Sequence, residues 1–350
     1  MVEIRHRLYS LQAGRAIAAI AIAIYHANAV LTLDKYLGVD ILPIANLMPF
    51  GVPFFFVMSG FVMSALHWKY IGQPGRASSF LLKRFSRIYP PLWAALILAS
   101  ILIFLVKGSL PSIFFLFNAA FITPLGFGSS EPLLAVEWTL RHEILFYGFF
   151  SLIILRPKIG FAVFVAWVAC GAILPSAPEN WYGVLISPYN VGFPFGMLAA
   201  AAFKFEAFSG KRAPLAVALG TLLCALTALV HAQRDLSMFS QVVGYSASSM
   251  LILIGCVELE RSGRLSVGWG LVFLGDASYS IFLVHFLAVS AAAKFAVKFV
   301  ELGMPNIVAL AGVVLASLLF GVIYYLVVEK FILAHIIGLF RKESIASKPA

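Results

Sequence analysis

Long apolar runs alternate with short polar connections along the whole chain. Ten segments are long enough, or nearly so, to cross the roughly 30 Å hydrocarbon layer of a bilayer. They cover residues 12–33, 47–66, 88–106, 136–155, 159–174, 184–203, 214–231, 238–257, 271–297 and 307–333. Apolar residues are continuous within them, whereas strands of a closed β-barrel alternate apolar and polar positions. The pattern therefore predicts an all-α integral membrane protein, a bundle of about ten transmembrane helices.

Two stretches are shorter than the others. The run 111–123 is too short to span a bilayer, and we expect an interfacial or re-entrant piece there. The fifth segment, 159–174, is the shortest of the predicted spans. We find no internal repeat, and we expect residues 1–350 to form a single membrane domain with no separate soluble domain.

Composition supports the membrane prediction. Charged residues make up 11% of the chain, against about 25% in a typical soluble protein, and hydrophobic residues make up 62%. These values exclude both a soluble globule and a disordered chain. The net charge is +10, but most basic residues lie in short loops between apolar runs, so we predict no nucleic-acid partner. The three cysteines have no metal-ligand spacing, and we predict no metal site.

Counts of lysine and arginine in alternate loops predict the orientation, because cytoplasmic loops are enriched in these residues. Eighteen of them lie on one side of the predicted membrane. Five lie on the other side: Lys35, Lys107, Arg234, Lys294 and Lys298. We therefore expect both termini in the cytoplasm, which also requires an even number of spans.

The N-terminal segment has a competing interpretation as a signal peptide. Arg5 and Arg7 precede an apolar stretch, and residues 27–29 resemble a cleavage site. However, the stretch contains Arg15 and continues to Leu33, which favours an uncleaved first span.

The first span carries two ionisable residues, and a charge inside a bilayer span is a functional candidate because it is costly. Arg15 and His26 are 11 residues apart, which returns them to one helix face with about 16 Å between them along the axis. The alternative is an arginine that reaches the headgroups and a histidine that bonds between helices.

Two further spans place ionisable groups at a similar depth. Glu143 in the fourth span and His285 in the ninth are each predicted about 20 Å from the cytoplasmic surface, close to the depth of His26. The pattern indicates a polar layer built by three helices. The alternative is a buried polar cluster that only holds the bundle together.

The third span is preceded by basic residues, and Arg84 and Arg87 are neighbours on a helix because they lie three residues apart. Such a pair suits a phosphate, although a plain membrane anchor has the same composition. In the second span, Ser59 and Gly60 favour close helix packing, and Ser59 could add a hydroxyl to the polar layer.

These residues lie in motifs that resemble the acyltransferase 3 family of integral-membrane O-acyltransferases, and the resemblance extends from Leu11 to about Lys330. Five motifs occur in order: Leu11–Ala16 with His26 after it, Phe55–Phe61, Arg84–Pro90, Glu137–Tyr147 and Leu274–His285. Many members have an aspartate before the first arginine and two glutamates in the fourth motif. This chain departs from them with Gln12 and His142, and both variants look like the exopolysaccharide-production (ExoZ-type) branch.

The resemblance implies transfer of an acyl group, usually acetyl from acetyl-CoA, to a sugar hydroxyl of an exopolysaccharide or its lipid-linked precursor. The functional residues of the family match Arg15, His26, Arg84 and Arg87. Acyl-CoA would be a co-substrate, with no permanently bound cofactor. The expected partners are acyl-CoA, a polysaccharide or lipid-linked oligosaccharide and membrane lipid, and the expected location is the bacterial cytoplasmic (inner) membrane.

The expected mechanism assigns a role to each residue. Arg15, Arg84 and Arg87 would hold the phosphates of acyl-CoA. His26 would be the general base, because histidine with an ordinary pKa of about 6.5 suits that task. Glu143 would orient His26 from its other ring nitrogen, and His285 could bind the acceptor or take the place of Glu143. The acceptor or a supporting polar layer would involve further side chains: His285, Ser59, Asp276 and Tyr279.

A transporter for polysaccharides or lipid-linked sugars is the alternative from another functional class. It would use the same polar layer to bind its cargo. A pair of short, interrupted segments at matching points of two halves is typical of many transporters. We find no such pair in this chain.

Overall fold

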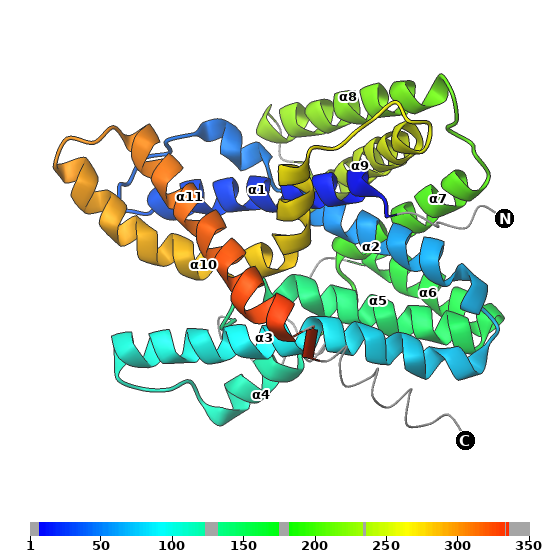
Figure 1. Ribbon diagram of the computed structural model, residues 1–350, viewed down its shortest axis with the longest axis horizontal. Coiled ribbons are helices and arrows are strands. Elements are labelled where there is room, and N and C mark those ends of the chain that lie inside the picture. The colour runs from blue at the N-terminus through cyan, green and yellow to red at the C-terminus, as the bar shows by residue number, and fades with distance from the viewer. Residues whose placement is uncertain (1–6, 123–131, 175–181, 234–235, 333, 336–350) are drawn as a thin grey trace.

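The structure is a computed structural model, described over residues 7–122, 132–174, 182–233, 236–332 and 334–335. These residues form helices and connecting turns, with no strand among them. The helices are α1 Tyr9–Leu31, α2 Gly51–His67, α3 Ala77–Lys107, α4 Ile113–Phe121, α5 Glu137–Leu155, α6 Pro157–Ile173, α7 Gly192–Lys204, α8 Arg212–Gln233, α9 Met238–Arg261, α10 Trp269–Glu301 and α11 Asn306–Tyr324 (Figure 1). The all-α prediction is confirmed.

Eight helical segments of the described chain are long and apolar enough to cross a membrane. The fifth and sixth predicted spans correspond to α6 and α7, which have 17 and 13 residues. The count of about ten spans is therefore approximate. Between the spans, the nine-residue α4 covers most of the run expected to be too short to span.

Helix α3 begins earlier than the apolar pattern predicts. It extends over 31 residues from Ala77, whereas the predicted third span begins at residue 88. The first turns of α3 mix apolar residues with Lys83, Arg84 and Arg87, and these charges keep the turns outside the continuous apolar run that defines the predicted span. Pro90 and Pro91 lie inside this helix, where each removes one backbone hydrogen bond.

Helix α1 runs through the middle of the bundle, with α10 and α11 on one side and α2 and α9 on another (Figure 1). Gly275 allows the close contact between α1 and α10, because a Cβ atom there would collide with the backbone of Gln12. Gly60 and Gly196 do the same for α2 and α7. A Cβ atom at either glycine would meet backbone atoms of the facing helix.

Helices α1 and α10 run in the same direction. Their contacts follow the same order along both helices: Gln12 meets Gly275, Arg15 meets Ser278, and His26 meets His285. The predicted topology has both spans crossing outward, and the parallel arrangement agrees with it. Residues of the first and fifth motifs therefore line one interface.

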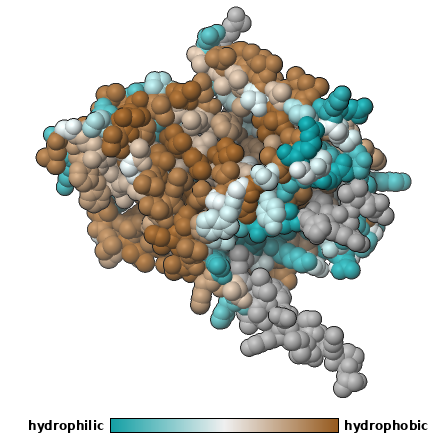
Figure 2. Space-filling model, turned by 45° about the horizontal axis from the view of Figure 1, so that its top comes forward, coloured by the Kyte–Doolittle hydropathy of each residue, from teal (hydrophilic) through white to brown (hydrophobic). Residues whose placement is uncertain are grey.

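The outer surface is that of a membrane protein. On α8, five exposed leucines recur at helical spacing along one face: Leu215, Leu219, Leu222, Leu226 and Leu229. Such a stripe in water would be a large sticky patch, whereas in a bilayer it contacts lipid tails. Figure 2 shows a broad hydrophobic area, with hydrophilic side chains gathered toward one part of the view. The protein is a multi-pass membrane protein.

Candidate active site

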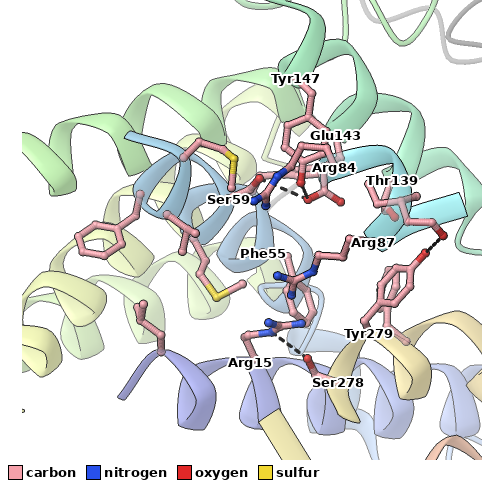
Figure 3. Close-up of a pocket in the computed structure, with 18 of the residues that line it drawn as sticks. Arg15, Phe55, Ser59, Arg84, Arg87, Thr139, Glu143, Tyr147, Ser278 and Tyr279 are labelled. Carbon is pink, nitrogen blue, oxygen red and sulfur yellow. Dashed lines mark hydrogen bonds between the residues drawn. The ribbon is translucent and has the colours of Figure 1, made fainter. Parts of the chain in front are cut away.

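A cavity of about 480 Å³ lies inside the bundle, between α1, α2, α3, α5 and α10. One wall is apolar and comes mainly from α2, with Met58, Phe61 and Val62 among its residues. The facing wall is polar and includes the three predicted phosphate-binding arginines: Arg15, Arg84 and Arg87. Figure 3 shows their side chains directed into the same space from α1 and α3. A cavity with these two walls suits a ligand that is partly apolar and partly anionic.

Arg15 is held at the interface of α1 and α10. Its Nε donates a hydrogen bond of 2.9 Å to the hydroxyl oxygen of Ser278 (Figure 3). The close approach at Gly275, one turn before Ser278, brings the two helices near enough for this bond. Because only Nε is used, the terminal nitrogens of the guanidinium are available for a ligand.

Arg84 and Arg87 have no carboxylate partner in the described part of the chain. Arg84 lies over the rings of Phe80 and Tyr147, with its Cζ atom 5.9 Å and 6.0 Å from the ring centroids. Its buried Nε has no hydrogen-bond partner among the described residues. Arg87 lines the cavity and makes no hydrogen bond or ion pair with a described residue. Two adjacent guanidinium groups with no bonded carboxylate favour an anion in the cavity.

Glu143 faces the cavity from α5, and its hydrogen bonds differ from the prediction. Its Oε1 accepts a hydrogen bond of 3.4 Å from the Ser59 hydroxyl and another from the phenol of Tyr147. The predicted contact with His26 is wrong, because no described hydrogen bond joins the two residues. A shared depth along the membrane normal does not fix the direction in which each side chain points.

His26 instead pairs with His285. Its Nδ1 lies 2.8 Å from Nε2 of His285, and the two ring planes are nearly parallel, 16° apart, with centroids separated by 5.1 Å. Neither histidine lines the cavity. The cavity wall toward them includes Phe55 and Phe282, whose ring centroids are 5.6 Å apart, and Phe282 also contacts His285. The arginine cavity and the histidine pair are thus neighbours, because Phe282 lines the cavity and also contacts His285.

Asp276 and Tyr279 act at the edges of the site. Asp276 forms an ion pair with Arg7, and this hydrogen bond raises the pKa of the Arg7 guanidinium above its ordinary value. Arg7 itself lines the cavity. Tyr279 also lines it, and its hydroxyl donates a 2.8 Å hydrogen bond to the backbone carbonyl of Ile88, which fastens α10 to α3 beside the two prolines. Within the described residues, no group of three or more His, Cys, Asp or Glu could hold a metal ion.

Comparison with known proteins gives the family. The model of the acyltransferase 3 family, described as an acyltransferase domain, matches residues 8–326. The chain belongs to this acyltransferase family. The match includes every helix that lines the cavity, so the arginine cavity and the histidine pair are features of an acyltransferase domain.

Two relatives of this acyltransferase are similar over most of their length. The exopolysaccharide production protein ExoZ of Rhizobium meliloti (strain 1021) is 28% identical over 292 residues, which cover 80% of this chain and 88% of that protein. The acyltransferase MdmB of Streptomyces mycarofaciens is 24% identical over 319 residues, which cover 81% and 79%. No solved structure matches the chain. The protein is therefore a membrane O-acyltransferase, and the transporter alternative is not supported.

Two polar side chains of the site had no role assigned from the sequence. Tyr147 bonds Glu143 from one turn further along α5, and this spacing of four residues is a signal that could have identified the pair. Ser278 bonds Arg15 across the interface of α1 and α10, although the two residues are 263 positions apart in sequence. It lies in the fifth motif, but its partner depends on the crossing of α1 and α10.

Proposed function

We propose that this acyltransferase takes an acyl group from acyl-CoA, most simply acetyl-CoA, and transfers it to a sugar hydroxyl of an exopolysaccharide or its lipid-linked precursor. One observation carries the donor assignment. Arg15, Arg84 and Arg87 line one cavity, and neither arginine of α3 has a carboxylate partner among the described residues. Coenzyme A supplies phosphates for these guanidinium groups and an apolar arm for the wall on α2.

The dimensions of α1 fit this donor. Arg15 and His26 are separated by about 16 Å along the helix axis, which is comparable to an extended pantetheine arm. If Arg84 and Arg87 hold the phosphates of acyl-CoA, its thioester would therefore lie near the histidine pair. Phe55 and Phe282 stand between the cavity and the histidines, and their side chains would have to turn aside for the acyl group to arrive.

Glu143 has a revised role in this proposal. Its carboxylate lies on the cavity wall, where Ser59 and Tyr147 orient it. A carboxylate has about four acceptor sites, so it can also accept a hydrogen bond from an amide N–H of the pantetheine arm. Glu143 would then position the donor and would not act on His26.

The acceptor would approach His26 from the side opposite the cavity. The ring of Tyr25 lies 5.1 Å from His26, and Tyr189 and Trp138 form a neighbouring pair 4.9 Å apart. Such amphipathic rings offer an apolar face and a hydrogen-bonding group, which together suit a sugar. The relative named for exopolysaccharide production supports a polysaccharide acceptor for this chain as well.

The chemistry needs one proton acceptor. An alcohol is a weak nucleophile at neutral pH, so His26 would take its proton as the oxygen attacks the thioester carbonyl carbon. The C–S bond then breaks, and the proton returns from His26 to the thiolate of coenzyme A. An ester and a thiol result, with no redox change. With the donor cavity facing the cytoplasm of a bacterial cell, the acceptor would lie on the outer side of the inner membrane.

The test adds [¹⁴C]acetyl-CoA to membranes from two strains of the native host, one with the gene and one in which it is deleted. We expect label in the polysaccharide fraction when the gene is present, and loss of that label when it is deleted. Mild alkali should release it as acetate, because it would be held as an ester. Absence of ester-linked acetate in both strains would contradict the proposed function.

A further inference from the structure

We propose that His285 is a positioning residue that keeps the hydrogen of His26 on Nδ1, so that Nε2 of His26 is free to act as the base. The inference rests on the proposed function, because it assigns His26 the proton transfer. The sequence favoured Glu143 for orienting His26 and left two roles open for His285, binding of the acceptor or the place of Glu143; the contacts in the structure select the second. This role depends on the position of the hydrogen on His285, on the charge of His285 and on its contact with His26.

Backbone carbonyls of α10 determine which ring nitrogen of His285 carries the hydrogen. Its Nδ1 lies 2.7 Å from the backbone carbonyl oxygen of Phe282 and 3.2 Å from that of Ile281. A carbonyl oxygen can only accept, so Nδ1 must carry the hydrogen. Both carbonyls belong to the preceding turn of α10, which also fixes the orientation of the ring.

The charge of His285 follows from its surroundings. The residue is 1% exposed, and none of its described hydrogen bonds involves a carboxylate. Its ring contacts are with Phe282 and His26. A buried imidazolium without an anionic partner is costly, so the neutral form is the stable one. With its hydrogen on Nδ1, the Nε2 atom of neutral His285 is an acceptor.

The acceptor on His285 in turn determines which nitrogen of His26 carries the hydrogen. Its Nδ1 lies 2.8 Å from the Nε2 acceptor of His285, so Nδ1 of His26 must donate. The Nε2 atom of His26 then has a lone pair, and it has no hydrogen-bond partner among the described residues. His26 is only partly buried, unlike His285. A backbone carbonyl of α10 therefore determines, through two imidazoles, which nitrogen of His26 can receive a proton.

The pair also suits the protonated state. When Nε2 of His26 takes the proton of the attacking hydroxyl, His26 becomes an imidazolium whose Nδ1–H still donates to His285. The geometry resembles the arrangement in which a carboxylate orients a catalytic histidine, with a neutral imidazole in its place. The proton then passes from Nε2 to the leaving thiolate, and His285 neither gains nor loses a proton.

The test compares two substitutions of His285 in the full-length protein in lipid nanodiscs. H285L removes the acceptor, so the hydrogen of His26 can move to Nε2. H285Q keeps an acceptor, because the amide oxygen of glutamine reaches about the position of Nε2. We expect kcat for acetyl transfer from acetyl-CoA to fall at least about 100-fold in H285L, the size of a general-base contribution. KM for acetyl-CoA should change less than about threefold, and H285Q should recover kcat to within about tenfold of the unsubstituted protein.

A second measurement needs neither the acceptor nor turnover. The ¹⁵N spectrum of histidine-labelled protein, with His26 assigned by its loss in H26A, should contain a protonated Nδ1 and an unprotonated Nε2. In H285L the hydrogen of His26 should redistribute toward Nε2. H285L should also have no further effect on the residual activity of H26A, because His285 acts through His26.

The outcomes separate this inference from the proposed function. Unchanged kcat in H285L, equal losses in H285L and H285Q, or a wild-type spectrum with the hydrogen on Nε2 would each overturn the role of His285. If instead the unsubstituted protein transfers no acetyl group, or H26A is fully active, the proposed function fails. The spectrum still reports whether His285 fixes the tautomer of His26.

Discussion

Nδ1 of His26 lies 2.8 Å from Nε2 of His285, although 259 residues separate the two histidines in sequence. The contact joins the first and last of the ordered motifs across parallel helices α1 and α10. Arg15 and Ser278 form a second bond in the same interface, on the cytoplasmic side of the histidines in the predicted orientation. The interface of α1 and α10 therefore holds both Arg15, which lines the cavity, and the histidine pair.

Loss of the imidazole of His26 should abolish transfer while acyl-CoA still binds. We expect H26A to lower kcat at least about 100-fold, because general-base work typically contributes 10²–10⁴-fold. The matched control is H231A on α8, which lies outside the cavity and the histidine pair. Transfer assays and acyl-CoA binding on the same purified samples make the comparison. An H26A protein with half of the normal activity would contradict the assignment.

The arginines of α3 should control donor affinity. We expect R84A or R87A to weaken acetyl-CoA binding about tenfold or more, because charge-assisted hydrogen bonds to phosphate are lost. K83A on the same turn is the control, since Lys83 is exposed and does not line the cavity. Titration calorimetry at two salt concentrations measures both effects. An R84A/R87A double variant with normal affinity would return these residues to a role as membrane anchors.

Substitution of Glu143 should affect donor binding more than turnover. We expect E143Q to raise KM for acetyl-CoA several-fold with kcat nearly unchanged, because its carboxylate bonds Ser59 and Tyr147 on the cavity wall and does not contact His26. E301Q, at the end of α10 and away from the cavity, is the control. A large fall in kcat at normal KM would instead favour direct coupling between Glu143 and His26.

The packing of α2 against α7 should depend on its glycines. A Cβ atom at Gly196 would meet the backbone of Val57 and Phe61, whereas one at Gly148 would meet nothing within 4 Å. We expect G196A to destabilise the protein by about 1–3 kcal/mol through overpacking, and G148A to be neutral. Thermal unfolding in detergent compares the two variants. Equal unfolding midpoints would mean that the contact between α2 and α7 accommodates the added methyl group without loss of stability.

The orientation prediction can be tested by cysteine labelling. In a background without Cys170, Cys224 and Cys256, a membrane-impermeant maleimide added to intact spheroplasts should label V39C and fail to label G75C. Val39 is 50% exposed and is preferable to Asp40, whose carboxylate accepts hydrogen bonds from Asn28 and Asn46. Gly75 has open space around it. The reverse labelling would invert the protein in the membrane and exchange the donor and acceptor sides.

The sequence by itself determined the helical membrane architecture and several of the polar residues that line the cavity. Continuous apolar runs require helices in a bilayer, because backbone groups must bond within each segment. The spacing of Arg15 and His26 correctly indicated one face of α1, since both residues contact α10. The start of α3 was missed, because three basic residues interrupt the apolar pattern of its first turns and the predicted span was limited to the continuous apolar run.

Only the tertiary structure decided which polar groups meet. Depth along the membrane follows from counting residues, so His26, Glu143 and His285 could be placed at one level. Their partners depend on the rotation of each helix and on which helices are neighbours, and these are set by close contacts such as Gly275 against Gln12. That packing turns Glu143 toward Ser59 and Tyr147 and brings His285 to His26, because side chains pair only where backbones approach closely enough.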